Sequence, residues 1–158
     1  MPKITALLHT HNDALRLGRT LDSLRPCDEV LIIDDCSEDD TERIAHENGA
    51  HIKSSIPGVS QGAYAMDAAN DWILCMLPNE ALSEELEASL QEWKNQEQAE
   101  TLSCCKVRVR EQNGSGWHEL DPEVRLINRK LMNWVGDLPP EQHCDITLSG
   151  ALLRFQHP

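Results

Sequence analysis

Short apolar runs alternate with amphipathic segments along residues 1–98, and this alternation constrains the fold more than any other feature of the sequence. One segment places apolar residues at 3-4-3 spacing, which is one stripe of a helix. Short apolar runs bounded by polar turns are typical of buried strands. The strands are expected at residues 3–8, 29–33, 50–54 and 72–77. We therefore predict an α/β fold, a Rossmann-like, mostly parallel sheet with helices on both faces.

The ends of the expected helices carry capping signals. Asn12 is a candidate N-cap for the first helix, and Ser37 and Asp40 have the spacing of a capping box for the second. Gly49 stands where that second helix should end, because glycine accepts the left-handed conformation of a C-cap. Ser83 is expected to cap a later helix, and a small alanine-rich helix is expected over residues 63–69.

The pattern changes after Gln98. Residues 101–112 alternate like an antiparallel strand, Asn113–Gly116 form a turn signal, and residues 123–129 and 151–155 follow as further strands. We see no repeat and no low-complexity linker. The chain is therefore predicted to be one domain with a β/α part at 1–98 and an antiparallel elaboration at 99–158.

Charge and cysteine content narrow the function classes. The net charge is −13, with 27 acidic against 14 basic residues, so the surface should repel nucleic acid and anionic lipid. No stretch approaches the roughly 20 apolar residues of a membrane span, and the opening run is too short for a signal peptide. The six cysteines form no CxxC motif, and Cys104 and Cys105 should face opposite sides of a strand, one in the core and one at the surface. Free thiols and a cytoplasmic location are expected.

Polar residues follow all four predicted parallel strands. They are His9–Asn12, Asp34–Ser37, Ser54–Gly58 and Pro78–Glu80. In open α/β sheets a ligand binds beyond the carboxyl ends of the strands, so together these loops predict a ligand crevice. Taken singly, each loop could simply be polar and cap its helix. Glycine-rich phosphate motifs are absent, and paired acids after the second strand can instead accept hydrogen bonds from a ribose or a base.

Several of these stretches resemble one known family. "ALLHTHNDALRLGRTLDSL" resembles the opening strand and helix of family-2 glycosyltransferases, with Thr10 and Asn12 matching and Asp13 standing for glutamate. "EVLIIDDCSEDDT" is similar to the family's Val-Asp-Asp/Ser-Gly-Ser-Thr-Asp-Gly-Thr signature, and "ANDWILCMLPNEALSEEL" to the segment ending in Leu-Asp-Ala-Asp-Glu. "VRLINRKLMNWVGDLPPEQH" resembles a stretch of the branch related to lipopolysaccharide-core enzymes.

The resemblance implies transfer of a sugar from a nucleotide-diphosphate donor to an acceptor hydroxyl with inversion. Residues 1–98 would then be the nucleotide-binding half and 99–158 the acceptor side. The residues expected to meet the nucleotide are Thr10, Asn12, Asp34 and Asp35. Glu141 is the candidate general base that deprotonates the acceptor. The acceptor itself is not identified, and a homodimer could complete a small acceptor side.

The chain departs from the family at the Asp-X-Asp motif, which holds the metal. Its positions here are Leu77, Pro78 and Asn79, and only Glu80 of the following acid remains. Mn²⁺ or Mg²⁺ prefers several anionic oxygen ligands, so Glu80 and Asn79 make a weak site. His9 and His11 could join Glu80 or Asp34 around zinc or manganese; alternatively, one faces solvent and the other hydrogen-bonds the loop. A degenerate relative that serves as a binding or scaffolding module is therefore the alternative function.

Overall fold

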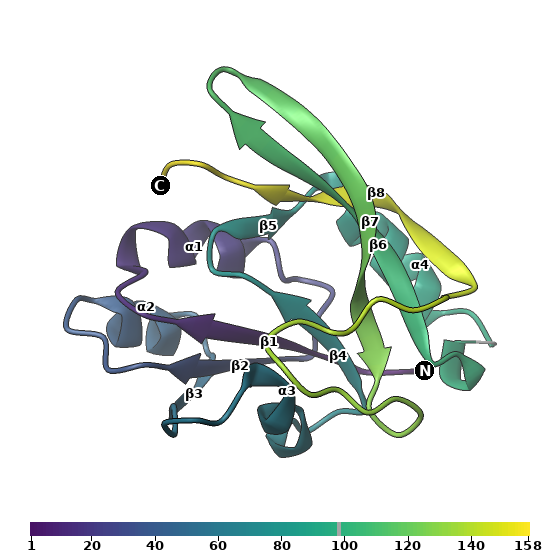
Figure 1. The fold of residues 1–158 in the computed structure, drawn as a ribbon, viewed down its shortest axis with the longest axis horizontal. Coiled ribbons are helices and arrows are strands. Elements are labelled where there is room, and N and C mark those ends of the chain that lie inside the picture. Colours follow the sequence, from purple (N-terminus) through teal and green to yellow (C-terminus); the bar gives the residue numbers. More distant parts are fainter. Residues whose placement is uncertain (98) are drawn as a thin grey trace.

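The computed structural model describes residues 1–97 and 99–158, which form one mixed sheet with helices against both faces (Figure 1). The strand order is β3-β2-β1-β4-β7-β6-β8-β5. The strands are β1 (Ile4–Thr10), β2 (Glu29–Asp34), β3 (His51–Ser54), β4 (Trp72–Met76), β5 (Glu80–Leu82), β6 (Cys104–Asn113), β7 (Gly116–Asn128) and β8 (Ile146–Arg154). The predicted boundary between the two parts, residue 98, lies outside the described residues, and strands from both parts share the sheet.

The first four strands pair in parallel, as the sequence predicts. β1 lies between β2 and β4, with Thr10 opposite Asp34 and Leu8 opposite both Ile32 and Met76. β2 also pairs with β3 in parallel. Every residue of β4 is buried, because strands covered on both faces need apolar side chains at successive positions rather than at alternate ones. The carboxyl ends of β1 and β2 therefore lie at one edge of the sheet, at the left of Figure 1.

The remaining strands extend this sheet with mostly antiparallel pairs. β7 runs antiparallel to β4 and forms a hairpin with β6 around Asn113–Gly116, which confirms the predicted turn. β8 pairs in parallel with β6 and antiparallel with the short β5. The sequence pattern did not reveal β5, since its three residues are too few to show a period.

The helices divide between the two faces. α1 (Ala14–Asp22), α2 (Thr41–Glu47) and α4 (Glu84–Lys94) contribute Leu17, Ala45 and Trp93 to the core on one face. The other face is covered by α3 (Gln61–Tyr64), by the 3₁₀ turn η1 (Ala65–Asp67) and by the segment after β7. A second 3₁₀ turn, η2, spans Ala99–Thr101. None of the described helices is long and apolar enough to cross a membrane.

The predicted helix ends are confirmed in part. Ser83 Oγ accepts a hydrogen bond from the Leu86 amide at 3.1 Å, and Gly49 has a left-handed φ of 74° just after α2. The other two N-caps were placed wrongly. α1 follows Asp13, and α2 follows Asp40. Asn12 and Ser37, the two predicted caps, instead make contacts across the sheet edge. Such tertiary contacts can be favoured over a local cap.

The cysteine prediction is wrong for two of the six residues. Cys104 and Cys144 form a disulfide with their Cα atoms 5.5 Å apart. Cys105 faces the opposite side of β6 from Cys104, as predicted, but both are buried because the sheet is covered on both faces. The disulfide ties the segment between β7 and β8 to β6. The cytoplasmic location stays a prediction.

Candidate functional site

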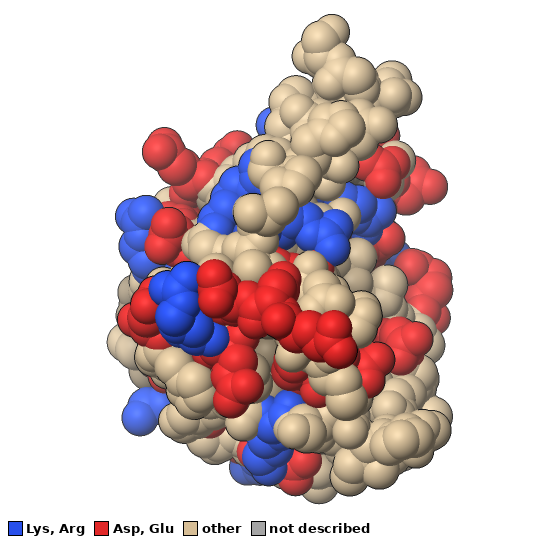
Figure 2. Space-filling view, turned by 90° about the vertical axis from the view of Figure 1, so that its left-hand side faces the viewer, with Lys and Arg blue, Asp and Glu red and all other residues tan. Residues whose placement is uncertain are grey.

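A cleft of about 510 Å³ opens at the carboxyl ends of β1 to β4, where the polar loops were predicted to converge. It is lined by His9, Thr10, His11, Asp13, Arg16, Asp35, Ser55, Ile56, Pro57, Gly58, Val59 and Pro78. Figure 2 looks onto this edge of the molecule and shows a band of acidic side chains, with Lys and Arg side chains gathered above it beneath the projecting hairpin. The predicted convergence of four loops is confirmed.

Asp34 braces the loops on either side of the cleft. Its Oδ1 accepts hydrogen bonds from the hydroxyls of Thr10 and Ser37, both at 2.6 Å, and its Oδ2 accepts from the Ser37 amide at 3.0 Å. Asn12 has a left-handed φ of 52°, and its Oδ1 accepts a hydrogen bond from the Glu38 amide at 2.8 Å. These contacts explain why neither Asp34 nor Asn12 lines the cleft, whereas Thr10 does.

Asp35 presents its carboxylate toward the cleft. The exposed Asp35 accepts a hydrogen bond from the Ser55 hydroxyl at 3.2 Å, which links the loops after β2 and β3. Its backbone oxygen lies 2.5 Å from Nδ1 of His11. This hydrogen bond, together with the charges of nearby aspartates, raises the pKa of His11. The two histidines and the paired aspartates therefore meet at one site, as predicted.

His9 lies deeper in the same cleft. Its ring packs edge-on against Tyr64 with the centroids 5.6 Å apart, and the Tyr64 hydroxyl accepts a hydrogen bond from the Ile56 amide at 2.6 Å. Nε2 of His9 is enclosed and has no hydrogen-bond partner among the described residues. Burial lowers the pKa of His9, although the charges of Asp137 and Asp35 oppose the shift. His9 is therefore a neutral imidazole at neutral pH.

The loop after β4 is fixed by a buried ion network. Glu80 is fully buried, and its carboxylate accepts two hydrogen bonds from Arg125, at 2.8 and 2.9 Å. Arg154 donates two more, at 3.0 and 3.1 Å, and the Leu77 amide donates a fifth at 2.9 Å. Burial alone would lower the pKa of Arg125, but the charge of Glu80 and its hydrogen bonds raise it above its ordinary value. Both oxygens of Glu80 are therefore occupied by cations of the protein.

Comparisons with known proteins agree with this geometry. The sequence profile of glycosyl transferase family 2 matches residues 5–59, which span β1 to β3 and the loop after β3. An uncharacterized glycosyltransferase of Rickettsia felis is 38% identical over 95 residues, covering 58% of this chain and 34% of the relative. One from Rickettsia prowazekii is 25% identical over 158 residues, covering 94% of this chain and 54% of the relative.

The fold is found in solved glycosyltransferase structures. The structure of S. aureus TarS 1-349 in complex with UDP-GlcNAc superposes with a TM-score of 0.56 and 20% identity, over 72% of this chain and 36% of that one. Residues 5–59 of the chain thus resemble family-2 glycosyltransferases in sequence, and the fold resembles that of TarS. It spans about half or less of the curated relatives described above. The link to the lipopolysaccharide-core branch stays a prediction.

The donor set of a family-2 metal site does not assemble in this chain. Leu77 and Pro78 carry no oxygen on their side chains, and the burial and ion pairs of Glu80 contradict its predicted role as a metal ligand. The side-chain nitrogen of Asn79 donates to the backbone oxygen of Phe155 at 3.5 Å. Among the described residues, no group of three or more His, Cys, Asp or Glu side chains could hold a metal ion. The residues present therefore do not fit Mn²⁺ or Mg²⁺, and His9 and His11 find no third ligand.

Glu141, the predicted general base, lies in the segment between β7 and β8. Its carboxylate is exposed and accepts a hydrogen bond from Nζ of Lys106 in β6 at 2.5 Å. Glu141 does not line the cleft, so its role as a general base stays a prediction.

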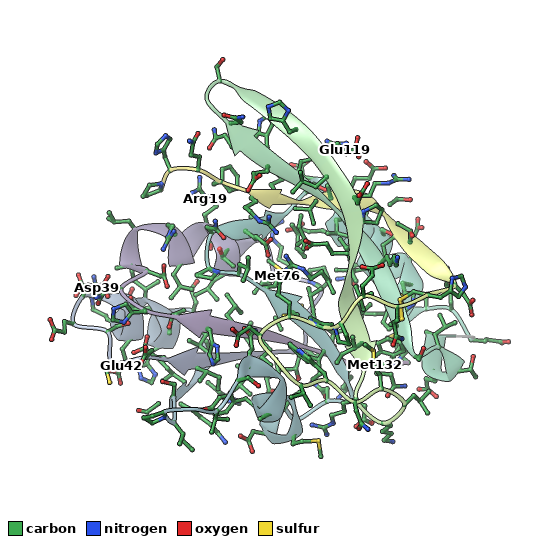
Figure 3. All side chains as sticks on the ribbon, viewed as in Figure 1. Arg19, Asp39, Glu42, Met76, Glu119 and Met132 are labelled. Carbon is green, nitrogen blue, oxygen red and sulfur yellow. A yellow bond between two sulfur atoms is a disulfide. The ribbon has the colours of Figure 1, made fainter. Side chains whose placement is uncertain are left out.

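The same segment also contacts helix α3. Its Gly136 oxygen accepts a hydrogen bond from the Gly62 amide at 2.8 Å, and Met132 is buried beside the end of β7 (Figure 3). Contact with α3 near its middle and the disulfide to β6 near its end thus hold this segment at two points.

Arg16 is the cleft residue that sequence reasoning missed. It lies in the first turn of α1 and pairs with Asp13. Its spacing of three from Asp13 was visible in the sequence, but a charge pair within one helix turn usually lies on a solvated face. Only the fold shows that this face borders the cleft.

Proposed function

We propose that this chain is the donor-binding part of a glycosyltransferase that moves a sugar from a nucleotide-diphosphate donor to an acceptor hydroxyl. The observation that carries the proposal is the 510 Å³ cleft at the carboxyl edge of a parallel sheet, with Thr10 and Asp35 on its wall. A volume of this size accommodates a small organic ligand. The Rickettsia relatives are named as glycosyltransferases, and this name and the fold shared with TarS support the same function.

The residues of the cleft have separate roles in the proposal. Asp35 accepts hydrogen bonds from the nucleoside. Thr10 and Asp34 hold in place the wall against which the nucleoside lies. The half-buried His9 ring contributes to the wall of the cleft. Because the Thr10–Asp34 bond and the Asp35–Ser55 bond form within the protein itself, the nucleoside side of the cleft is preorganised.

Transfer with inversion requires a base on the acceptor side. Glu141 takes the proton of the acceptor hydroxyl while the acceptor oxygen forms a bond to the anomeric carbon of the donor sugar. The bond from that carbon to the diphosphate oxygen breaks at the same time. The nucleoside diphosphate leaves with the electron pair of that bond. Nζ of Lys106 lies 2.5 Å from a Glu141 oxygen and orients the carboxylate.

Nucleotide binding is the first test. Isothermal titration with the five common nucleoside diphosphates should find at least one that binds, and Asp35→Asn should weaken it about tenfold, the loss of one hydrogen bond with a charged partner. Glu119→Gln is the matched control, since Glu119 lies on the far hairpin (Figure 3). If no nucleoside diphosphate binds, the proposal is wrong.

Catalysis is tested separately from binding. Glu141→Gln should keep the affinity for the nucleotide within twofold and lower the release of nucleoside diphosphate from the matching sugar donor by about a hundredfold or more. Unchanged release would reject Glu141 as the base. A wild-type chain that binds the nucleotide but never turns over any sugar donor would support the binding module instead.

A further inference from the structure

We propose that the cleft binds a nucleoside diphosphate without a divalent cation, and that Arg16 supplies the positive charge that faces the diphosphate. The inference rests on the proposed nucleotide-binding function and adds how the charge of the ligand is balanced. Two independent observations carry it: the state of Glu80 and the position of Arg16.

Glu80 already has cations around it. Five N–H groups point at its two oxygens, and two guanidinium groups provide four of them. A metal ion at this carboxylate would have to displace Arg125, whose side chain is 1% exposed. Arg125 would then be a buried unpaired charge, which proteins tolerate poorly. The ion network therefore competes directly with a metal at the one acid left after β4.

Arg16 borders the place where a diphosphate would lie. It lines the main cleft and also an adjoining hollow of about 320 Å³, which Asn79 and Arg154 line from the other side. Pro78 lines the main cleft and Asn79 the hollow, so the loop that carries the Asp-X-Asp motif in the family separates the two. Arg16 stands at the junction of both spaces.

The guanidinium group of Arg16 has donors to spare. One Nη atom pairs with the buried carboxylate of Asp13, which also accepts a hydrogen bond from the His11 amide at 2.8 Å. In the part of the chain that the structure describes, the Nε and the other Nη atom of Arg16 have no partner, and the side chain is 38% exposed. Arginine binds phosphate oxygens through just such a planar pair of donors.

Apart from its two histidines, the described lining of the cleft carries a single basic side chain. Among the described lining residues, Arg16 is the one lysine or arginine, and Asp13 and Asp35 are both acidic. A diphosphate in an acidic cleft on a chain of net charge −13 needs a nearby cation to bind at all. Arg16 is therefore the residue on which discrimination between a nucleoside diphosphate and its nucleoside should depend.

The test compares the wild-type chain with two Arg16 variants and one control variant. The affinity for each of the five common nucleoside diphosphates is measured by titration and divided by the affinity for the matching nucleoside. Each titration is done in about 2 mM MnCl₂, which would saturate a metal site of the affinity of a sensor site, and again in about 2 mM EDTA, which removes the metal. Arg16→Gln removes the charge and Arg16→Lys keeps it. Arg19→Gln is the matched control, because Arg19 lies one turn along the same helix over the Phe155 ring, outside the cleft (Figure 3).

The expected result is specific. Diphosphate affinity should agree within about twofold between manganese and EDTA, and Arg16→Gln should lower it by about tenfold or more while nucleoside affinity stays the same. The diphosphate affinity of Arg16→Lys should lie between those of Arg16→Gln and the wild type, and the affinity of Arg19→Gln should match that of the wild type. Thermal unfolding of each variant shows whether it is folded.

Three results would overturn the inference. A tenfold or greater gain from manganese would show that a metal takes part. An unchanged diphosphate-to-nucleoside ratio in Arg16→Gln would remove Arg16 from the site. Either leaves the proposed function standing, whereas failure of every diphosphate to bind in both buffers would overturn the proposed function as well.

Discussion

Replacement of Glu80 by glutamine tests the ion network behind the cleft most directly. The change preserves size and shape but removes the negative charge between Arg125 and Arg154. Oε1 now accepts from two N–H groups and Oε2 from three. In glutamine one of these oxygens becomes an NH₂ group, which cannot accept a hydrogen bond. Whichever way the amide turns, that NH₂ would face at least two N–H donors.

The size of the effect follows from what each arginine keeps. Arg125 retains Glu123 at 2.9 Å and the Cys75 backbone oxygen at 3.0 Å, but it stays enclosed. Arg154 is 18% exposed and keeps Glu111 at 3.6 Å, so water can solvate it. Most of the cost therefore falls on Arg125. Breaking a buried pair by removing one partner costs about 3–5 kcal/mol, and the partners that remain place Glu80→Gln near the lower end, at about 3 kcal/mol.

Urea unfolding measures this loss. With a slope of about 2 kcal/mol per molar urea, the unfolding midpoint should fall by about 1.5 M. Glu47→Gln is the control, because the Arg43–Glu47 pair is exposed on α2 and should change stability by less than about 0.5 kcal/mol. The double variant Glu80→Leu with Arg125→Met should be more stable than Glu80→Leu alone, since it leaves no buried arginine unpaired. A Glu80→Gln loss as small as that of the control would refute the reasoning.

Two further predictions concern the packing of helix α3 and the two histidines of the cleft. Gly62→Ala should lower the free energy of unfolding by about 1–3 kcal/mol and shift the fluorescence of Trp134, because an added Cβ would lie 2.5 Å from the Trp134 backbone oxygen. Gly18→Ala is the control: it has open space around it inside helix α1 and should raise the free energy of unfolding by about 0.5–1 kcal/mol. Equal effects of the two substitutions would contradict the packing argument. In an NMR titration His9 should titrate below pH 6.5 and His11 above it. The folded state should therefore lose stability through His9 as pH falls below 6.5 and through His11 as pH rises above 6.5, and the reverse order of the two pKa values would contradict the geometry.

The parallel half of the fold was predictable because its signal is local. Buried strands such as Ile4–Thr10 and Trp72–Met76 must be apolar at successive positions, and this leaves short apolar runs that the sequence shows directly. The convergence of His11 and Asp35 then follows from parallel pairing alone. Nothing about either residue type needed to be known beyond its place after a strand.

What the sequence could not show depends on contacts between distant residues. Glu80 stands after an apolar run, like a ligand at a strand end, yet its partners are 45 and 74 positions away. The Cys104–Cys144 pair closes a separation of 40 residues with no motif to mark it. Asp34 and Asn12 were correctly placed at the sheet edge but hold loops together there rather than line the cleft, a distinction that only side-chain directions decide.

The loop after β4 joins stability to the candidate site. The Thr20 hydroxyl lies 2.9 Å from the Pro78 backbone oxygen and 2.6 Å from that of Glu80, and the Phe155 amide donates to the Asn79 backbone oxygen at 2.9 Å. Helix α1, the residue that follows strand β8, and the two arginines paired with Glu80 therefore fix this loop in the protein alone. A loop already held in place loses little conformational freedom when a ligand arrives. The same network that removes Glu80 from metal binding thus keeps Pro78 in position on the wall of the cleft, so a variant that loosens it should weaken nucleotide binding together with folding stability.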